Sequence, residues 1–299
     1  PKLMGLARQE AQRTLRFILG YRLLRDLRRG WRFNNPNLDQ LNLLAIQYRG
    51  LDEFSGEAAL FAANPVLSAM TPGQRTEMAI SVFDAMRGAL CLETRYLDAV
   101  EQERAKATAF QYLSERWTFG DENLETSRWL ILSKRPEDKK GKPRTDLVPG
   151  GARSRLLKEL KALPLWKSPN LMGTVKGWKD AQWLELLQLF LIGASHYGYA
   201  QRHEVEPNLI GWRLNASAMD WVLVDTPEVE QEGKHNRFFR QLYLSVAATL
   251  TQQQHTLFDF EAQEHTAQVD AGRRQLLEQR FRYTEKDRKD WLENPAHEA

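Results

Sequence analysis

The segment from Asp180 to Leu214 constrains the fold of this chain more than any other stretch. It starts with a residue suited to cap a helix, runs through the apolar sequence WLELLQLFLI, and reaches a glycine-containing break at 193–198. Strand-like patterns at 199–205 and 209–214 follow, separated by a Glu-Pro-Asn turn. A helix, a tight break and a two-stranded ribbon form the second half of a winged helix, so the pattern favours that fold. Any helix before any hairpin gives the same pattern, and that interpretation stays open.

The overall composition is that of a soluble globular protein. The chain has 299 residues, enough for roughly two domains, with 42% hydrophobic and 27% charged residues. No apolar run reaches the length of about 18 residues that a membrane span needs, and residues 1–17 lack the pattern of a signal peptide. Cys91 is the single cysteine, which excludes an internal disulfide and a multi-cysteine metal site. We therefore expect a cytoplasmic protein with no membrane partner.

Positive charge is concentrated at the N-terminal end. Residues 1–32 hold nine Lys and Arg against two acidic residues, a local balance of +7. Apolar residues at three- and four-residue steps predict one helix over 6–29. Its apolar stripe is expected to be Leu15, Ile18, Leu19, Leu23 and Leu27. Arginines occupy much of the remaining surface, which makes nucleic acid a suitable partner, and solvated arginines on a surface helix are the alternative interpretation.

Further periodic segments predict a mainly α fold with small β elements. Helices are expected at 57–63, 72–92, 99–112, 154–162, 179–194, 237–250 and 269–281. Short strands are expected at 43–48, 221–224 and 257–260, with residues 31–33 as a candidate partner of the first.

A change of composition between residues 133 and 151 predicts an exposed loop or linker, because Lys, Pro, Gly and Asp dominate there and apolar residues nearly vanish. It would separate a helical accessory domain with a short β-hairpin, at 1–132, from a winged-helix-like domain at 152–225. A connecting helix is expected within 226–256. Residues 257–299 form the remaining part.

Catalytic and nucleotide-binding motifs are missing from the sequence. It has no GxxxxGK[ST] loop, no GxGxxG, no HExxH and no GxSxG. The loop Pro149–Gly151, ahead of Arg153 and Arg155, could offer N–H groups and cations to a phosphate, but such loops are more often only turns. His196 and His203 have no carboxylate at ligand spacing from both. We expect no metal, no cofactor and no catalytic activity in this chain by itself.

Three stretches together resemble one family. They are residues 19–53, the segment GWRLNASAMDW at 211–221, and EAQEHTAQVDAGRRQLLEQRFR at 261–282. In this order they resemble the segment between the two halves of the motor in large bacterial superfamily 2 helicases of the DEAD/DEAH type. These helicases carry a C-terminal domain of unknown function and occur in phage-defence and DNA-repair settings. The resemblance extends over nearly the whole chain and is weaker over 55–180.

This resemblance implies that residues 1 to about 250 are an accessory insertion into the second RecA-like domain. Residues 257–282 would re-enter that domain as a partial RecA-like edge, with Glu264–Gln268 ending a core strand. The next helicase motif would lie past Ala299, and the nucleotide-binding loop, DEAH-type box and arginine finger are absent. ATP and Mg²⁺ are therefore expected for the parent helicase and not for this chain.

The first functional hypothesis is a nucleic-acid-handling accessory region of an ATP-dependent DNA helicase. Lys and Arg would contact phosphates, so binding would be salt-dependent and nearly sequence-blind. The helix at 183–192 is apolar almost all round and should be buried, which argues against base reading in a major groove. The candidate contacts are Arg22, Arg25, Arg28, Arg29, Arg32, Lys158, Lys161, Arg202 and Arg213.

Two other hypotheses remain. The chain could be a protein-interaction scaffold that packs on the motor lobes of its helicase or docks a partner protein of a phage-defence complex, which its nine tryptophans favour. A free-standing DNA-binding regulator is the weaker alternative, because the final residues DRKDWLENPAHEA look cut. A continuous basic stripe from the first helix to the hairpin would favour DNA, and dispersed charge would favour the scaffold.

Overall fold

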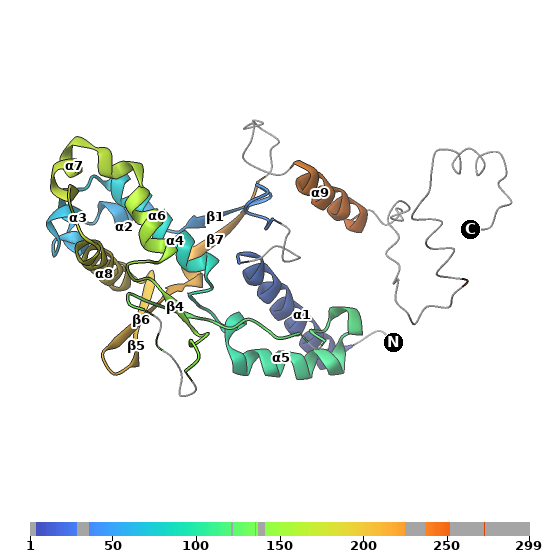
Figure 1. The fold of residues 1–299 in the computed structure, drawn as a ribbon. Helices are drawn as coiled ribbons and strands as arrows, with labels where there is room; N and C mark the ends of the chain where they lie inside the picture. Colours follow the sequence, from blue (N-terminus) through green and yellow to red (C-terminus); the bar gives the residue numbers. More distant parts are fainter. Residues whose placement is uncertain are drawn as a thin grey trace. The chain divides into compact units, whose positions relative to one another are not determined.

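A computed structural model of the chain describes residues 4–28, 36–120, 122–134, 136, 141–224, 237–251 and 272 (Figure 1). The chain divides into two compact units, Pro1–Arg240 and Gln241–Ala299. Helix α9 (Arg237–Thr251) begins at the end of the first unit and lies mostly in the second. The predicted strand at 257–260 lies outside the described residues, and so does the predicted helix at 269–281 apart from one residue.

The first unit is mainly helical with small β elements, which confirms the predicted fold class. Its α-helices are α1 (Gly5–Asp26), α2 (Leu51–Gly56), α3 (Pro65–Ala69), α4 (Pro72–Gly88), α5 (Ala99–Tyr112), α6 (Arg155–Ala162), α7 (Pro169–Val175) and α8 (Asp180–Tyr197). Short 3-10 helices are η1 (Ala58–Phe61), η2 (Arg95–Leu97), η3 (Glu115–Trp117), η4 (Pro164–Lys167) and η5 (Ala216–Ala218). The strands are β1 (Leu44–Tyr48), β2 (Leu92–Glu93), β3 (Trp129–Ile131), β4 (Leu147–Pro149), β5 (Ala200–Glu206), β6 (Leu209–Asn215) and β7 (Met219–Leu223).

Several helices begin where a side chain can accept the first free backbone N–H groups. Asp98 accepts a hydrogen bond from the N–H of Glu101 at 2.9 Å and starts α5. Ser154 does the same for α6, and Thr71 forms a capping box with Gln74 at the start of α4. These helices therefore start at the predicted places. The helix expected at 57–63 is shorter, because only the 3-10 turn η1 forms there, between α2 and α3.

Helix α8 extends past Gly193 and ends at Gly198, whose φ of 96° is the left-handed conformation that ends many helices. Gly193 does not break the helix as expected. A Cβ there would lie 2.9 Å from the carbonyl oxygen of Leu60, so the glycine permits close packing of α8 on η1. Strands β5 and β6 follow as an antiparallel hairpin with Asn208, at φ 63°, in its turn. The helix and hairpin predicted at 180–214 are confirmed, with the helix end moved to Gly198.

Strand β6 is the centre of the main sheet. It pairs antiparallel with β5 on one side, and on the other it pairs antiparallel with β3 and parallel with β2. Strand β4 extends the sheet by pairing parallel with β3. Thus part of the segment predicted as an exposed loop at 133–151 is a strand, because Leu147 is fully buried against the sheet. A helix followed by a hairpin that shares a sheet with an earlier strand is the arrangement expected of a winged helix.

A separate two-stranded sheet joins β1 and β7. The two strands are antiparallel, from the pair Leu44–Leu223 to the pair Tyr48–Met219. Both strands were expected from the sequence, at 43–48 and 221–224, but not as partners. Residues 31–33, the predicted partner of the first strand, lie outside the described residues.

Helix α1 forms over nearly the predicted range, and Ile18 and Leu27 of the predicted stripe are buried, but the rest of the buried face is rotated from that stripe. Leu19 is 51% exposed, whereas Phe17 and Tyr21 are buried. Their rings pack against Tyr96 and Phe119, with centroids 5.3 and 5.4 Å apart. Aromatic rings bury more area than leucine does, so they decide which face turns inward.

One hydrophobic core runs through the first unit. Fully buried Phe54 of α2 contacts Phe83 of α4, Phe190 of α8 and Tyr199 before β5, with ring centroids 5.1–6.3 Å apart. The segments 1–132 and 152–225, predicted as two domains, share this core and the main sheet.

Candidate nucleic-acid interface

Two of the candidate arginines lie on α1 and a third lies in the turn just after it, and each meets a carboxylate of the segment that follows η3. Arg22 makes two parallel hydrogen bonds to Glu122, both with a nitrogen–oxygen distance of 2.6 Å. Arg25 lies 3.6 Å from the same carboxylate, and Arg28 is ion-paired with Glu125. The hydrogen bonds from Arg22 hold the pKa of Glu122 below its usual value, so this carboxylate is ionised at neutral pH.

The segment that carries these two carboxylates is fixed by the fold. The N–H of Glu125 donates to the hydroxyl of Tyr21 at 2.9 Å. The amide of Gln102 donates to the carbonyl oxygens of Tyr96 and Glu125 at 3.0 and 2.8 Å. Phosphates that bound at Arg22, Arg25 or Arg28 would have to displace carboxylates that are already in place. This arrangement disfavours these three arginines as phosphate contacts.

Arg213 of β6 contacts residues of two neighbouring strands, β2 and β3. Its guanidinium carbon lies 3.8 Å from the centroid of the Trp129 ring, and its Nη1 lies 3.0 Å from Oε2 of Glu93. It also donates to the carbonyl oxygens of Ser127 and Arg128 at 3.3 and 3.2 Å. Only 18% of the side chain is exposed. The sequence predicts that Arg213 contacts nucleic acid, but its guanidinium N–H groups donate to Glu93, Ser127 and Arg128 inside the fold. Its role is therefore structural.

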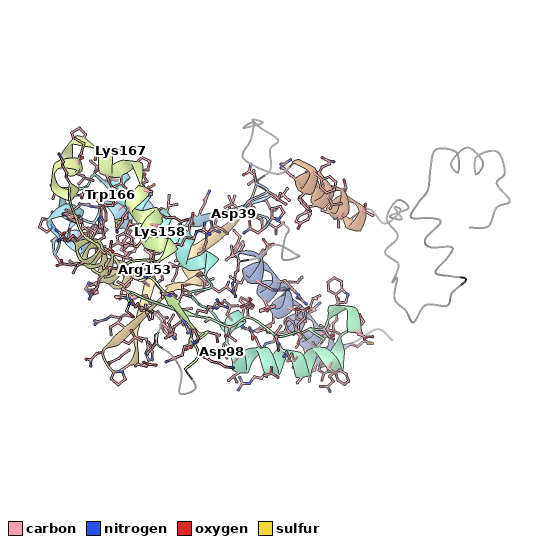
Figure 2. All side chains as sticks on the ribbon, in the orientation of Figure 1. Asp39, Asp98, Arg153, Lys158, Trp166 and Lys167 are labelled. Atoms are coloured by element: carbon pink, nitrogen blue, oxygen red, sulfur yellow. The ribbon has the colours of Figure 1, made fainter. Side chains whose placement is uncertain are left out.

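Helix α6 presents one available cation on its outer face. Lys158 lies on α6 (Figure 2) and is exposed. Lys161, one turn further on, is ion-paired with Asp180, and Arg155 is 2.7 Å from Glu159. Leu156, Leu157 and Leu160 fill the opposite face and are buried. Among the residues that the structure describes, no carboxylate is ion-paired with Lys158.

The hairpin presents a second available cation. Arg202 lies on β5, the outer strand, and is exposed. Its neighbour His203 stacks on Trp129 with ring centroids 5.2 Å apart, which ties the strand to β3. At the end of β5, Glu206 is ion-paired with Arg144. No ion pair of Arg202 occurs within the described part of the chain.

The predicted contacts that the structure describes therefore do not form one continuous stripe of unpaired charge. Five of them are ion-paired: Arg22, Arg25, Arg28, Lys161 and Arg213. Lys158 and Arg202 are exposed. Arg29 and Arg32 lie outside the described residues.

The glycine loop at 149–151 packs against β3 and is not a phosphate cradle. The N–H of Gly150 donates to the carbonyl oxygen of Ile131 at 2.6 Å, so it is not available to a ligand. A Cβ at Gly150 would lie 3.1 Å from that same oxygen, and one at Gly151 would lie 3.0 Å from the backbone of Ser133. The glycines allow this segment to pack closely beside β3.

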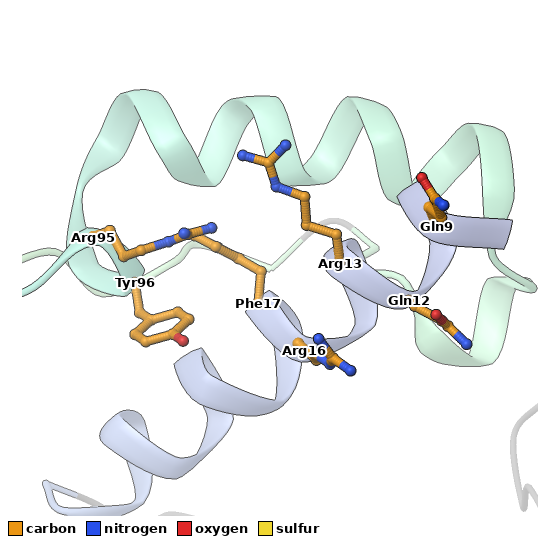
Figure 3. A pocket seen from close by; sticks show the side chains of 7 residues that line it. All are labelled: Gln9, Gln12, Arg13, Arg16, Phe17, Arg95 and Tyr96. Atoms are coloured by element: carbon orange, nitrogen blue, oxygen red, sulfur yellow. The ribbon is translucent and has the colours of Figure 1, made fainter. Parts of the chain in front are cut away.

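A group of arginines that the sequence hypotheses did not select lines a surface pocket of about 360 Å³ between α1 and η2 (Figure 3). Arg13 and Arg16 come from α1, and Arg95 comes from η2. The spacing of the first two on one helix face is visible in the sequence. The third joins them only because α1 packs on η2.

The described residues show no metal-binding cluster, no reactive cysteine and no membrane-spanning helix. No group of three or more His, Cys, Asp or Glu side chains there is placed to hold a metal ion. Cys91 is fully buried, which raises the pKa of its thiol to about 12. None of the helices described is both long and apolar enough to span a membrane.

The helicase resemblance rests on stretches of sequence whose last part, 261–282, lies almost wholly outside the described residues. It therefore stays a prediction. Comparison of the chain with models of known protein families, with curated proteins and with solved structures found no match in any of the three.

Proposed function

We propose that this chain binds nucleic acid through the phosphate backbone and is the accessory region of an ATP-dependent DNA helicase or translocase. The observation that carries the proposal is the group of elements α6, α7, α8 and the β5–β6 hairpin, in which the hairpin shares a sheet with β3. Each of its two outward parts presents an exposed cation, Lys158 on α6 and Arg202 on β5. ATP and Mg²⁺ chemistry would belong to the rest of the parent protein.

The burial of α8 supports contact with the phosphate backbone of a nucleic acid and not the reading of bases. Trp183, Leu186, Leu187 and Phe190 of α8 are buried, so this helix is part of the core and cannot enter a major groove. Phosphates are the groups that exposed lysine and arginine on α6 and β5 can reach without such insertion. Binding of this kind fixes the position of a strand and carries no sequence information.

The test is fluorescence anisotropy with labelled single-stranded, duplex and forked DNA at about 50 and about 200 mM salt. Wild-type protein should bind at the lower concentration and lose most of its affinity at the higher one. The double variant Lys158→Glu/Arg202→Glu should bind at least about tenfold more weakly at the lower salt, because two phosphate contacts become repulsive. A double variant that binds like wild type would contradict the proposed surface.

The matched control is Arg104→Glu/Arg49→Glu. Both arginines are exposed, at 71% and 67%, and each is already ion-paired with a neighbouring carboxylate. The control changes net charge by the same amount, so an equal loss of affinity in the two variants would mean that only overall charge matters. Absence of binding to all three DNA forms at low salt would overturn the nucleic-acid function itself.

A second candidate function is a protein-interaction scaffold within the helicase or a phage-defence complex. The pairing of Arg22, Arg25 and Arg28 with carboxylates disperses the charge, which favours this alternative. The exposed large apolar side chains also include Phe110 at 89% and Trp117 at 53%. If this function holds, the substitutions Phe110→Ser and Trp117→Ser should weaken the association with the separately produced motor lobes, measured by calorimetry, and leave DNA binding unchanged.

A further inference from the structure

None of the described residues that line the pocket between α1 and η2 is a carboxylate. Its walls are Gln9, Gln12, Arg13, Arg16, Phe17, Arg95 and Tyr96. Two amides, three guanidinium groups and two aromatic rings make up this set. The volume of about 360 Å³ is near the lower end of the range of small-ligand pockets, which is about 300–1,000 Å³.

Packing fixes the position of Arg95 at the edge of this pocket. Its guanidinium carbon lies 5.6 Å from the ring centroids of both Phe17 and Tyr96. These distances are within the range of cation–π attraction, which orients a guanidinium group and leaves its N–H donors free. Phe17 is buried in the core, so the platform under Arg95 is rigid.

The other two cations come from the same face of α1. Arg13 and Arg16 are three residues apart, so they are neighbours on the helix surface, and both are exposed. Arg22 and Arg25 further along α1 and Arg28 just after it are ion-paired. Arg13 and Arg16, by contrast, form no ion pair within the described residues. The same is true of Arg95 across the pocket. All three arginines line one pocket, and none of the described residues lining it is a carboxylate, so an anion bound there would meet no competing negative charge from these residues.

A glycine on α1 makes the approach of η2 possible. A Cβ at Gly20 would lie 2.6 Å from the ring of Tyr96, closer than any real side-chain contact. The tyrosine ring therefore occupies the space that a side chain at position 20 would fill. Gly20 thus sets the distance between α1 and η2, and through it the distance between Arg95 and the two arginines of α1.

We propose that this pocket binds the phosphate of one nucleotide in a single strand of nucleic acid. This inference rests on the proposed function and adds a second contact surface to it. Guanidinium groups match phosphate oxygens with paired N–H donors. The amides of Gln9 and Gln12 supply neutral donors and acceptors for a base edge.

The experiment measures binding of a labelled single-stranded oligonucleotide of about 12 residues to three proteins by anisotropy. They are the wild type, Arg13→Gln/Arg16→Gln/Arg95→Gln, and the control Arg49→Gln/Arg104→Gln/Arg155→Gln, which removes three exposed and ion-paired arginines. The pocket variant should bind at least about tenfold more weakly than the wild type, because three phosphate-directed cations are lost. The control should change by less than about twofold, since its arginines are already paired.

A charge-neutral variant gives an independent readout. Gly20→Ala should displace Tyr96 and Arg95 from α1, and so weaken strand binding at least about threefold with no change of charge. A Gly20→Ala protein that keeps its melting temperature but binds like wild type would overturn the role of the pocket geometry.

Competition with small ligands identifies the source of the phosphate. Adenosine monophosphate and inorganic phosphate should displace the oligonucleotide only at far higher concentrations than an unlabelled strand does. Displacement by the mononucleotide at equal nucleotide concentration would overturn the proposal that the ligand is a single strand, and would assign the pocket to a free nucleotide. Displacement by a phosphotyrosine peptide, but not by adenosine monophosphate, would overturn the nucleic-acid ligand altogether.

The outcome also separates this inference from the proposed function. If Lys158→Glu/Arg202→Glu weakens DNA binding and the pocket variant does not, the pocket inference fails and the proposed function stands. If wild-type protein binds no DNA, both fail.

Discussion

Arginine side chains in this chain divide according to what lies within reach of the guanidinium group. Arg22 and Arg213 contact carboxylates that other parts of the fold hold in place. Arg13 and Arg95 face a pocket without carboxylates. A phosphate gains the full charge-assisted hydrogen bond at an arginine of the second group, and at the first it competes with an existing ion pair. Pairing, more than the density of arginine, thus decides which residues are free to bind.

The structural role of Arg213 leads to a stability prediction. Arg213→Ala should lower the free energy of unfolding by about 2–4 kcal/mol, because Glu93 and two carbonyl oxygens lose their donor. Arg213→Lys should lose less, since it keeps the charge but not the planar contact with Trp129. Arg202→Ala on the neighbouring strand is the control and should stay within about 0.5 kcal/mol. Urea unfolding followed by tryptophan fluorescence measures all three, and equal values for Arg213→Ala and Arg202→Ala would contradict the role of Arg213.

Asp26 makes stability depend on pH. Burial is the main cause that raises its pKa from 3.8 to about 6, and nearby Asp39 adds to it, while the N–H of Leu38 acts in the opposite direction. The carboxyl thus binds its proton more tightly in the folded state. The stability from this group is fully present below about pH 4 and is lost as the pH rises through about 6.

Asp26→Asn removes this titration and keeps an oxygen that can accept from the N–H of Leu38. It should raise the free energy of unfolding by about 1–2 kcal/mol at about pH 7.5, and the gain should shrink as the pH is lowered toward 4. Urea unfolding at several pH values is the measurement. A gain that does not change with pH would show that the pKa of Asp26 is ordinary in the folded protein.

At the scale of elements, the close packing of α8 on η1 depends on Gly193. Gly193→Ala places a methyl group 2.9 Å from the carbonyl oxygen of Leu60. The backbone of α8 or η1 has to shift to make room for this methyl group. The cost should be about 1–3 kcal/mol and exceed the gain of up to about 1 kcal/mol in helix propensity. Gly173→Ala in α7 has open space around its Cβ and should be neutral or stabilising. Thermal unfolding compares the two; a stabilising Gly193→Ala would contradict the packing described.

Elements set by local chemistry could be predicted from the sequence. Helix α5 starts at its predicted residue because Asp98 caps it, and α6 does so because of Ser154. The hairpin follows from alternation around a tight turn. Long-range choices could not be predicted. Strands β1 and β7 pair across more than 170 residues of sequence, and β4 follows a polar segment and begins at a single fully buried leucine, Leu147.

The candidate site shows the same limit. The sequence displays the arginines of α1 but not Glu122, which lies 100 residues away from Arg22. It displays Arg13 and Arg16 but not Arg95, which reaches them only through the packing of η2 on α1. A surface of unpaired charge is a property of the fold, because both the cations and their partners come from distant segments.

The first unit behaves as a single body at the scale of the whole molecule, since Phe54 contacts residues of α4, α8 and the start of the hairpin. Phe54→Ala should lower the free energy of unfolding by about 3–5 kcal/mol. Hydrogen exchange should then speed up in both α4 and α8, because both helices lose a wall of the same core. Faster exchange in α4 alone would mean that the segments 1–132 and 152–225 unfold separately.

The central claim is that unpaired cations, and not the ion-paired ones, hold the nucleic acid. The most direct measurement is the slope of log affinity against log salt for single-stranded DNA. Two variants with equal loss of charge are compared with the wild type. The first changes the unpaired Arg13, Arg16, Arg95, Lys158 and Arg202 to Gln. The second changes the paired Arg49, Arg104, Lys106, Arg155 and Lys161 to Gln.

Each lost phosphate contact should lower the magnitude of the slope by about 0.7. The first variant should therefore lose about 3–4 in slope, and the second should keep the slope of the wild type. Equal slopes for the two variants, or a larger loss in the second, would contradict the claim and assign binding to net charge alone.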